Sequence, residues 1–273
     1  MVRSEYYRMS ELSTTAIQDN LPTKIFGRQV HYYPQIDSTN NRLKQLADQG
    51  IAEGVLLLAD EQLSGRGRFE RTWYAPPGSS LLTSLLFRPA FLSPIQAQQL
   101  TMICALAMVE AILDQTGLAV GLKWPNDLVY HGRKLAGILT ELGFVGHRLE
   151  WAVVGLGLNV NFDFSTLAEA KMLQQTATSL QSILGRPISR LALLRAYLVQ
   201  VEQRYLALRA GQSPFADWVQ KLETLGKMVT VSDLETTFSG LAESVTETGT
   251  LQVRLADGGL VSVMAGDVTL KAG

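Results

Sequence analysis

The sequence has few of the residues that build disulfides, metal sites and catalytic triads. Its one cysteine, Cys104, lies in the apolar segment 102–109, where no charged neighbour lowers the pKa of the thiol. A single thiol excludes an intrachain disulfide framework, indicates a core residue and favours a reducing compartment. The three histidines, His31, His131 and His147, lack ligand spacing, so neither a histidine-based metal site nor a Ser/His/Asp triad is expected.

An excess of charge of one sign is also absent, because 24 Lys and Arg face 25 Asp and Glu, for a formal net charge of −1. Non-specific binding of nucleic acid requires a strong basic excess. No uninterrupted apolar stretch approaches the roughly 20 residues that a membrane span needs, and the first 20 residues lack the pattern of a signal or transit peptide. We therefore expect a cytoplasmic protein that binds neither DNA nor membrane.

The apolar patterns predict an α/β (α+β) protein, in which several strands are near-continuous apolar runs, as in a sheet covered on both faces. Ser93 and Pro94 favour a helix start, and Gly117 a helix end. The predicted strands are 30–33, 55–59, 80–87, 120–124, 127–130, 135–142 and 150–158. The predicted helices are 37–48, 93–116, 177–184, 190–209 and 213–224, and the polar segment 62–71 is predicted to be a loop.

The composition changes after residue 225. Residues 228–270 have no helical period, and a hairpin signal at 257–259 divides short runs rich in Val, Thr and Leu. This pattern predicts a small β-barrel of fewer than about 50 residues, which should pack on the larger domain because so small a core is marginally stable alone. We divide the chain into an N-terminal arm, 1–24, a main domain, 25–225, and a C-terminal β domain, 226–273.

Two segments resemble nucleotide-binding motifs only in part. Residues 132–137 have the spacing of a P-loop opening, but Ile138 and Leu139 replace the Lys-Ser/Thr pair that reaches phosphate and magnesium. Residues 155–160 begin like a dinucleotide fingerprint but lack its third glycine. We expect turns and close backbone packing at both places, and no P-loop or Rossmann site.

In the segment 64–68, glycine alternates with arginine after Ser64. Gly65 and Gly67 allow backbone N–H groups to approach a ligand, while Arg66 and Arg68 offer forked donors suited to carboxylate and phosphate. Arg71 and Trp73, which follow, add charge and a stacking surface. Alone, such a segment is also typical of a solvated basic turn.

Polar groups also gather at the ends of the predicted strands. Lys123, Asn126 and Asp127 stand within five residues, where a ligand or a structural turn would satisfy them. Asp127 could hold magnesium or the amine of a lysine. Lys134 enters the next apolar strand, where it either snorkels to solvent or faces an anion. The segment 38–40 has hydroxyls and an amide, which an N-cap role already explains.

Taken together and in this order, these segments resemble the biotin–protein ligases (biotin–[acetyl-CoA-carboxylase] ligases), in the short form without an N-terminal DNA-binding domain. The resemblance is close over about 30–161 and loose over the C-terminal domain. Its matching segments are DSTN at 37–40, Gln62 with GRGR at 65–68, RTW at 71–73, KWPNDL at 123–128, RKLAGILTE at 133–141 and GLGLNVN at 155–161. It implies a mixed-sheet catalytic domain of the class II synthetase-like, biotin–lipoate ligase type, followed by an SH3-like barrel.

The resemblance also implies roles for individual residues. Contacts with biotin would come from Ser38, Thr39, Asn40, Gln62, Gly65, Arg66, Gly67, Arg68, Lys134 and Gly137. ATP or the adenylate would be held by Arg71, Trp73, Lys123, Asn126, Asp127 and Asn159. Lys134, Asp127 and Arg68 would be catalytic, and Asp127 could also bind Mg²⁺.

The implied reaction forms biotinyl-5′-AMP from biotin and ATP, then transfers biotin to a lysine of a biotin carboxyl carrier protein, an acetyl-CoA carboxylase subunit. The implied enzyme is a monomer or a weak homodimer. Glu70 departs from the family, which commonly has glycine there. Too few residues precede the first matched segment for a helix-turn-helix, so no repressor role is expected. The alternatives are a lipoate–protein ligase and a non-enzymatic RNA-binding or adaptor module.

Overall fold

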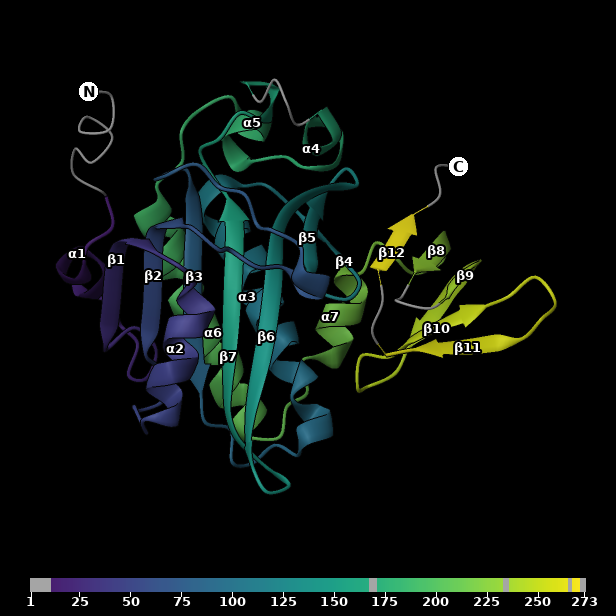
Figure 1. Ribbon diagram of the computed structural model, residues 1–273, viewed down its shortest axis with the longest axis horizontal. Coiled ribbons are helices and arrows are strands. Elements are labelled where there is room, and N and C mark those ends of the chain that lie inside the picture. The colour runs from purple at the N-terminus through teal and green to yellow at the C-terminus, as the bar shows by residue number, and fades with distance from the viewer. Residues whose placement is uncertain (1–10, 167–170, 233–235, 265–266, 271–273) are drawn as a thin grey trace.

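The computed structural model describes residues 11–166, 171–232, 236–264 and 267–270, which form two β-sheets with helices around the larger one (Figure 1). The larger sheet has the order β1-β2-β3-β7-β6-β5-β4. Its β1 and β2 are parallel and the remaining neighbours antiparallel, so the mixed sheet that was predicted is confirmed. Its strands are β1 Val30–Ile36, β2 Leu56–Gln62, β3 Ser80–Phe87, β4 Gly121–Lys123, β5 Asp127–Tyr130, β6 Arg133–Val145 and β7 Arg148–Asn159.

Helices cover both faces of this sheet to different extents. The helices are α1 Thr14–Gln18, α2 Thr39–Asp48, α3 Gln98–Thr116, α4 Lys171–Thr176, α5 Leu180–Leu184, α6 Arg190–Arg209 and α7 Phe215–Lys221. In Figure 1, α3 and α6 lie behind the sheet, where the main core forms, and α2 lies in front of it. A smaller apolar cluster joins α2 to the sheet through Leu43, Leu57 and Val153. Because α2 covers only part of the front face, sheet residues beside it stay open to a pocket.

The α3 helix is apolar nearly all round, and it is the central core helix. With the short 3₁₀ turn η2, Pro94–Gln96, it is long and apolar enough to cross a membrane, but it is mostly buried inside the protein. Cys104 lies on it and is fully buried. Burial raises the pKa of the Cys104 thiol to about 12, so the thiol stays protonated, as the sequence predicted for a core cysteine.

The N-terminal arm is tied to the main domain over its described part. Ser13 caps α1 by accepting a hydrogen bond from the backbone of Ala16 at 3.1 Å. Leu12 and Ile17 are buried, and α1 packs against α6. The described part of the N-terminal arm, 11–24, therefore contains a short helix that packs on the main domain, while residues 1–10 lie outside the described residues.

Two expectations about local structure were wrong. The predicted helix 177–184 begins only at Leu180, as α5, because the backbone of Ala177 pairs with Lys134 of β6, and the helix α4, which precedes it, was not predicted. The segment 155–160 is not a turn, because most of it belongs to β7. The close packing expected there is present, since Asn40 packs on Gly155 and Trp73 packs on Gly157. The loop predicted at 62–71 is confirmed, since β2 ends at Gln62 and the following residues form a hairpin-like loop.

The C-terminal domain is an antiparallel five-stranded sheet with the order β11-β10-β9-β8-β12. Its strands are β8 Met228–Ser232, β9 Thr237–Val245, β10 Leu251–Arg254, β11 Leu260–Val263 and β12 Asp267–Leu270. It packs on the main domain, as predicted: the buried indole Nε1 of Trp124 donates to the carbonyl of Gly249 at 2.8 Å. Thr224, just before the domain, accepts a hydrogen bond from the Trp124 backbone at 2.9 Å.

Candidate active site

A pocket of about 820 Å³ opens on the front face of the large sheet. Every predicted site residue lines this pocket except Gly65. The residues that line it come from α2, the ends of β2 and β4, the strands β6 and β7, and the segment before α5. Segments far apart in the sequence therefore form one cavity, which also includes Thr269 of the C-terminal domain.

Residues 64–73, which we name the arginine loop, form an irregular hairpin over the pocket. The backbone of Trp73 donates to the carbonyl of Gly65 at 2.9 Å, and Arg66 forms a bridge with Thr72. A Cβ at Gly65 would lie 2.9 Å from the carbonyl oxygen of Trp73. Gly65 thus permits the close backbone approach that shapes the loop.

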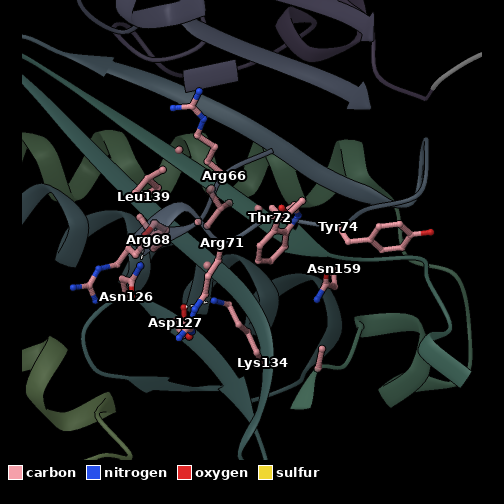
Figure 2. A pocket seen from close by; sticks show the side chains of 18 of the residues that line it. Arg66, Arg68, Arg71, Thr72, Tyr74, Asn126, Asp127, Lys134, Leu139 and Asn159 are labelled. Atoms are coloured by element: carbon pink, nitrogen blue, oxygen red, sulfur yellow. Dashed lines mark hydrogen bonds and ion pairs between the residues drawn. The ribbon is translucent and has the colours of Figure 1, made fainter. Parts of the chain in front are cut away.

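The arginines of the loop point in different directions. Figure 2 shows Arg71 directed toward Asp127 and Lys134, while Arg66 points the opposite way. Arg68 lies at the pocket wall, with its guanidinium 5.1 Å from the ring centre of Phe69. Arg66 nevertheless lines the pocket, on another side from Arg71.

The tip of the loop contains a strained residue. Phe69 adopts the left-handed conformation, with φ 53°, inside the 3₁₀ turn η1, Arg68–Glu70. An aromatic residue seldom adopts this conformation, which costs free energy that the surrounding structure must supply. The backbone of Glu70 belongs to this turn, whereas its side chain, whose charge the sequence flagged, lies outside the described residues.

The hairpin β4–β5 positions the next group of polar residues. Its turn contains a cis peptide bond between Trp124 and Pro125, and Lys123 is paired with Asp127 across the turn. The side-chain amide of Asn126 donates to the carbonyl of Ile138, whose own backbone N–H donates to the Asn126 carbonyl at 3.0 Å. Asn126 is therefore tied to β6, and it holds the turn against the pocket floor.

Asp127 and Lys134 form an ion pair at the centre of the site. Lys134 Nζ lies 2.7 Å from Asp127 Oδ1, and the side chains are 39% and 18% exposed, respectively. Although the pair is close, Asp127 Oδ1 is buried and has no hydrogen-bond partner among the described residues. The ammonium thus offsets the charge of the carboxylate, although the pair lacks the geometry of a hydrogen bond.

Trp73 fills the space over two glycines of the floor. A Cβ at Gly157 would lie 2.7 Å from Cε2 of the indole, and one at Gly137 would lie 3.2 Å from its Cζ3. Lys134 Nζ is 5.6 Å from the ring centre, within range of a cation–π interaction. The indole Nε1 is buried without a partner in the described part of the chain, so a ligand acceptor could satisfy it.

The N-terminus of α2 forms the opposite wall. Ser38 caps the helix by accepting from the backbone of Asn41 at 3.4 Å, as predicted. Gln62 Oε1 accepts from both the backbone N–H of Thr39, at 2.7 Å, and its hydroxyl, at 3.0 Å. At the far end of the pocket, Asn159 donates to the carbonyl of Thr178 at 3.1 Å. These side chains are thus held by the protein itself.

Sequence reasoning missed several residues of the pocket. Glu141 lines it from β6, and Tyr74, Phe164, Thr176 and Thr269 line it from other segments. A charged residue near the end of an apolar strand was the available signal for Glu141. The other four lie outside any recognisable motif and reach the pocket only through the tertiary fold.

Comparison with known proteins gives the class of the molecule. Residues 32–159 match the biotin/lipoate A/B protein ligase family, and residues 224–271 match the biotin protein ligase C-terminal domain. The chain is 31% identical to the bifunctional ligase/repressor BirA of Bacillus subtilis over 276 residues, which covers 98% of this chain and 83% of that protein. The chain therefore belongs to the biotin–protein ligase family.

A second sequence relative and a solved structure are also similar to this chain. The biotin–[acetyl-CoA-carboxylase] ligase of Paracoccus denitrificans is 34% identical, over 70% of this chain and 72% of that protein. The solved structure of the biotin protein ligase from Aquifex aeolicus in complex with biotin and ATP is 26% identical. It superposes with a TM-score of 0.73 over 90% of this chain and 100% of that one.

Proposed function

We propose that this protein is an ATP-dependent biotin–protein ligase. It forms biotinyl-5′-AMP from biotin and ATP and passes biotin to a lysine of a biotin carboxyl carrier protein, a subunit of acetyl-CoA carboxylase. The observation that most supports this function is the meeting of Arg71, Lys134 and Asp127 in one pocket beneath the arginine loop. Relatives named biotin–[acetyl-CoA-carboxylase] ligases support the same reaction.

In the first step, a carboxylate oxygen of biotin attacks the α-phosphorus of ATP, the bond from that phosphorus to the bridging oxygen breaks, and pyrophosphate leaves. Both reactants are anions, so their approach is repulsive unless cations lie between them. Lys134 and Arg71 provide that charge in a partly enclosed site, where it acts more strongly than in water. Lys123, at the end of β4, adds a third cation to the pocket wall.

A magnesium ion that arrives with ATP fits the residues of the site. Among the described residues no group of three or more His, Cys, Asp or Glu could hold a metal alone. Mg²⁺ usually takes one or two carboxylates together with phosphate oxygens and water. Asp127, whose Oδ1 has no hydrogen-bond partner among the described side chains, would hold it, and the ion would neutralise phosphate charge.

In the second step, the ε-amine of the acceptor lysine attacks the carbonyl carbon of the mixed anhydride, AMP leaves, and the nitrogen loses a proton. As the alternative to holding Mg²⁺, Asp127, which lines the pocket, would orient that amine or accept its proton. The adenylate is also open to hydrolysis, so the arginine loop, with Arg68, would close over it and exclude water. No covalent bond to the enzyme is needed.

Biotin is favoured over lipoate because the C-terminal domain matches that of biotin protein ligases. We further propose that the protein acts in the cytosol as a monomer or weak homodimer and does not bind DNA. Sedimentation with and without biotin and MgATP would test the oligomeric state.

The deciding experiment is mass spectrometry of a biotin carrier domain incubated with the protein, biotin and MgATP. We expect one biotinyl addition at a lysine of the carrier, and no addition when biotin is replaced by lipoate. Modification by lipoate alone, or no modification of the carrier by either acid, would contradict the proposal.

A further inference from the structure

Asn40 lies in the first turn of α2, and its side chain is almost entirely engaged by the protein. It is 6% exposed. Its Nδ2 donates to the carbonyl of Leu139 at 3.2 Å and to Oε2 of Glu141 at 2.8 Å, while its Oδ1 accepts from Ser84 at 2.6 Å. A carboxamide has two N–H donors, and both are used. Asn40 therefore has no N–H left for a ligand, and its contribution to the pocket is structural.

The position of Asn40 depends on three strands of the sheet. Ser84, Gly155 and Leu139 are neighbours in one row across β3, β7 and β6. Asn40 lies over the glycine of this row, where a Cβ would be only 2.2 Å from its Oδ1. The missing side chain at Gly155 thus makes the space in which the amide docks, and its row neighbours hold the amide on both sides.

Glu141 completes this arrangement from the next position on the same face of β6. Its Oε2 accepts from Asn40, and its Oε1 is paired with the ammonium of Lys44, one helical turn further along α2. The side chains of Lys44 and Glu141 are 27% and 30% exposed. One carboxylate therefore fastens two successive turns of α2 to the sheet at the edge of the pocket, which Glu141 also lines.

We propose that Glu141 is a positioning residue of the active site that acts through Asn40. By holding Asn40, it keeps the N-terminus of α2 against the sheet, so that Ser38 and Thr39 stay in place in the pocket wall that they form. Ser84 Oγ lies 2.6 Å from Asn40 Oδ1 and 2.8 Å from Thr39 Oγ1, so its single O–H is shared between these two acceptors and a displaced amide disturbs both neighbours. The inference rests on the proposed function, since it assigns this wall to biotin binding.

The test compares two substitutions of equal length at Glu141. Glu141→Met removes the acceptor for Asn40, and we expect the KM for biotin to rise about tenfold, while kcat and the KM for ATP stay within about twofold. Glu141→Gln retains an acceptor oxygen, and it should recover most of the lost affinity. As a matched control, Glu150→Met removes a carboxylate that is paired with Arg88 outside the pocket, and it should leave all three parameters unchanged.

A double-mutant cycle tests whether Glu141 acts through Asn40. In the Asn40→Ala background, Glu141→Met should raise the KM for biotin by no further factor, because the interaction is already lost. Additive effects, an unchanged KM in Glu141→Met, or equal defects in the Met and Gln variants would overturn the inference. A parent protein that neither binds biotin in calorimetry nor labels the carrier would instead overturn the proposed function.

Discussion

Lys134 and Asp127 lie on adjacent strands and form an ion pair at the centre of the site. They face each other because β5 and β6 form a hairpin with a register shift between Leu128 and Val129. The shift brings Lys134 Nζ to 2.7 Å from Asp127 Oδ1. The ammonium can therefore serve the carboxylate in the free protein and an incoming anion in the complex.

Replacement of Lys134 by alanine should reduce adenylate formation by about 100-fold or more, because a positioned cation in a partly enclosed site is worth several kcal/mol to a developing anionic transition state. The measurement is pyrophosphate release with biotin and MgATP. The control is Arg133→Ala, which removes an exposed cation on the opposite face of β6 and outside the pocket. Undiminished release in Lys134→Ala, with the control normal, would exclude the assigned role.

Cys104 should be inert to thiol reagents in the folded protein. Burial raises its pKa from about 9 to about 12, and the thiolate is the reactive form. The unfolded state loses this proton above about pH 9, whereas the folded state retains it up to about pH 12. The contribution of the thiol to the stability of the fold is therefore fully present below pH 9 and is lost as the pH rises toward 12. We expect negligible iodoacetamide labelling at pH 8, and complete labelling in denaturant. Rapid labelling of the native protein would show that the Cys104 thiol on α3 is accessible to the reagent.

At the scale of the element, β7 serves as a floor because of where its glycines fall. Gly155 and Gly157 are two residues apart, so both open toward the same face of the sheet. One makes room for Asn40 and the other for Trp73. A strand with side chains at these positions would fill the pocket that α2 leaves uncovered.

Substitution of Gly157 by alanine should displace Trp73, because the new Cβ would lie 2.7 Å from the indole. We expect a loss of about 1–3 kcal/mol of stability from overpacking and a rise in the KM for ATP. The measurements are urea unfolding and initial rates. If the clash is with Trp73, the Trp73→Ala/Gly157→Ala double variant should be no less stable than Trp73→Ala. A Gly157→Ala protein with parental stability and kinetics would show that the ring rests elsewhere.

At the scale of the whole molecule, the C-terminal domain is joined to the turn that carries Asn126 and Asp127. Trp124 lies in this turn, and its indole reaches the buried carbonyl of Gly249 between β9 and β10. Thr269 of the same domain lines the pocket. The small domain therefore supports the active site, and its loss should affect ATP use as well as stability.

Trp124→Phe tests this connection, because it removes the indole N–H and leaves the Gly249 carbonyl buried without its donor. We expect a loss of about 1–3 kcal/mol in the free energy of unfolding, measured by urea titration, with a weaker effect from Trp151→Phe. Trp151 donates at 2.9 Å to Asp48, whose exposed carboxylate can turn to water instead. Equal losses in the two variants would argue against a special role for the connection between the domains.

The sequence predicted most elements, because apolar periodicity and turn chemistry act over a few neighbouring residues. The predicted site residues came from the resemblance to the biotin–protein ligases, and all but Gly65 line the pocket. The strands 80–87 and 127–130 were predicted with the bounds that the structure shows. The predicted helix 177–184 started three residues too early, because the backbone of Ala177 pairs with Lys134 of β6, a contact for which the sequence has no local signal. The individual ligand assignments stay predictions, which the variants above are designed to test.

The chain order alone determined which chemical groups this protein possesses: the alternating glycines and arginines, the polar turn after β4, and the lysine at the head of β6. Only the tertiary structure decided which of them face a ligand and which face the protein. The side-chain amide of Asn40, for example, donates to Glu141, a residue 101 positions away. Such pairings depend on how strands and helices pack, and a polar side chain takes the partner that packing places within reach.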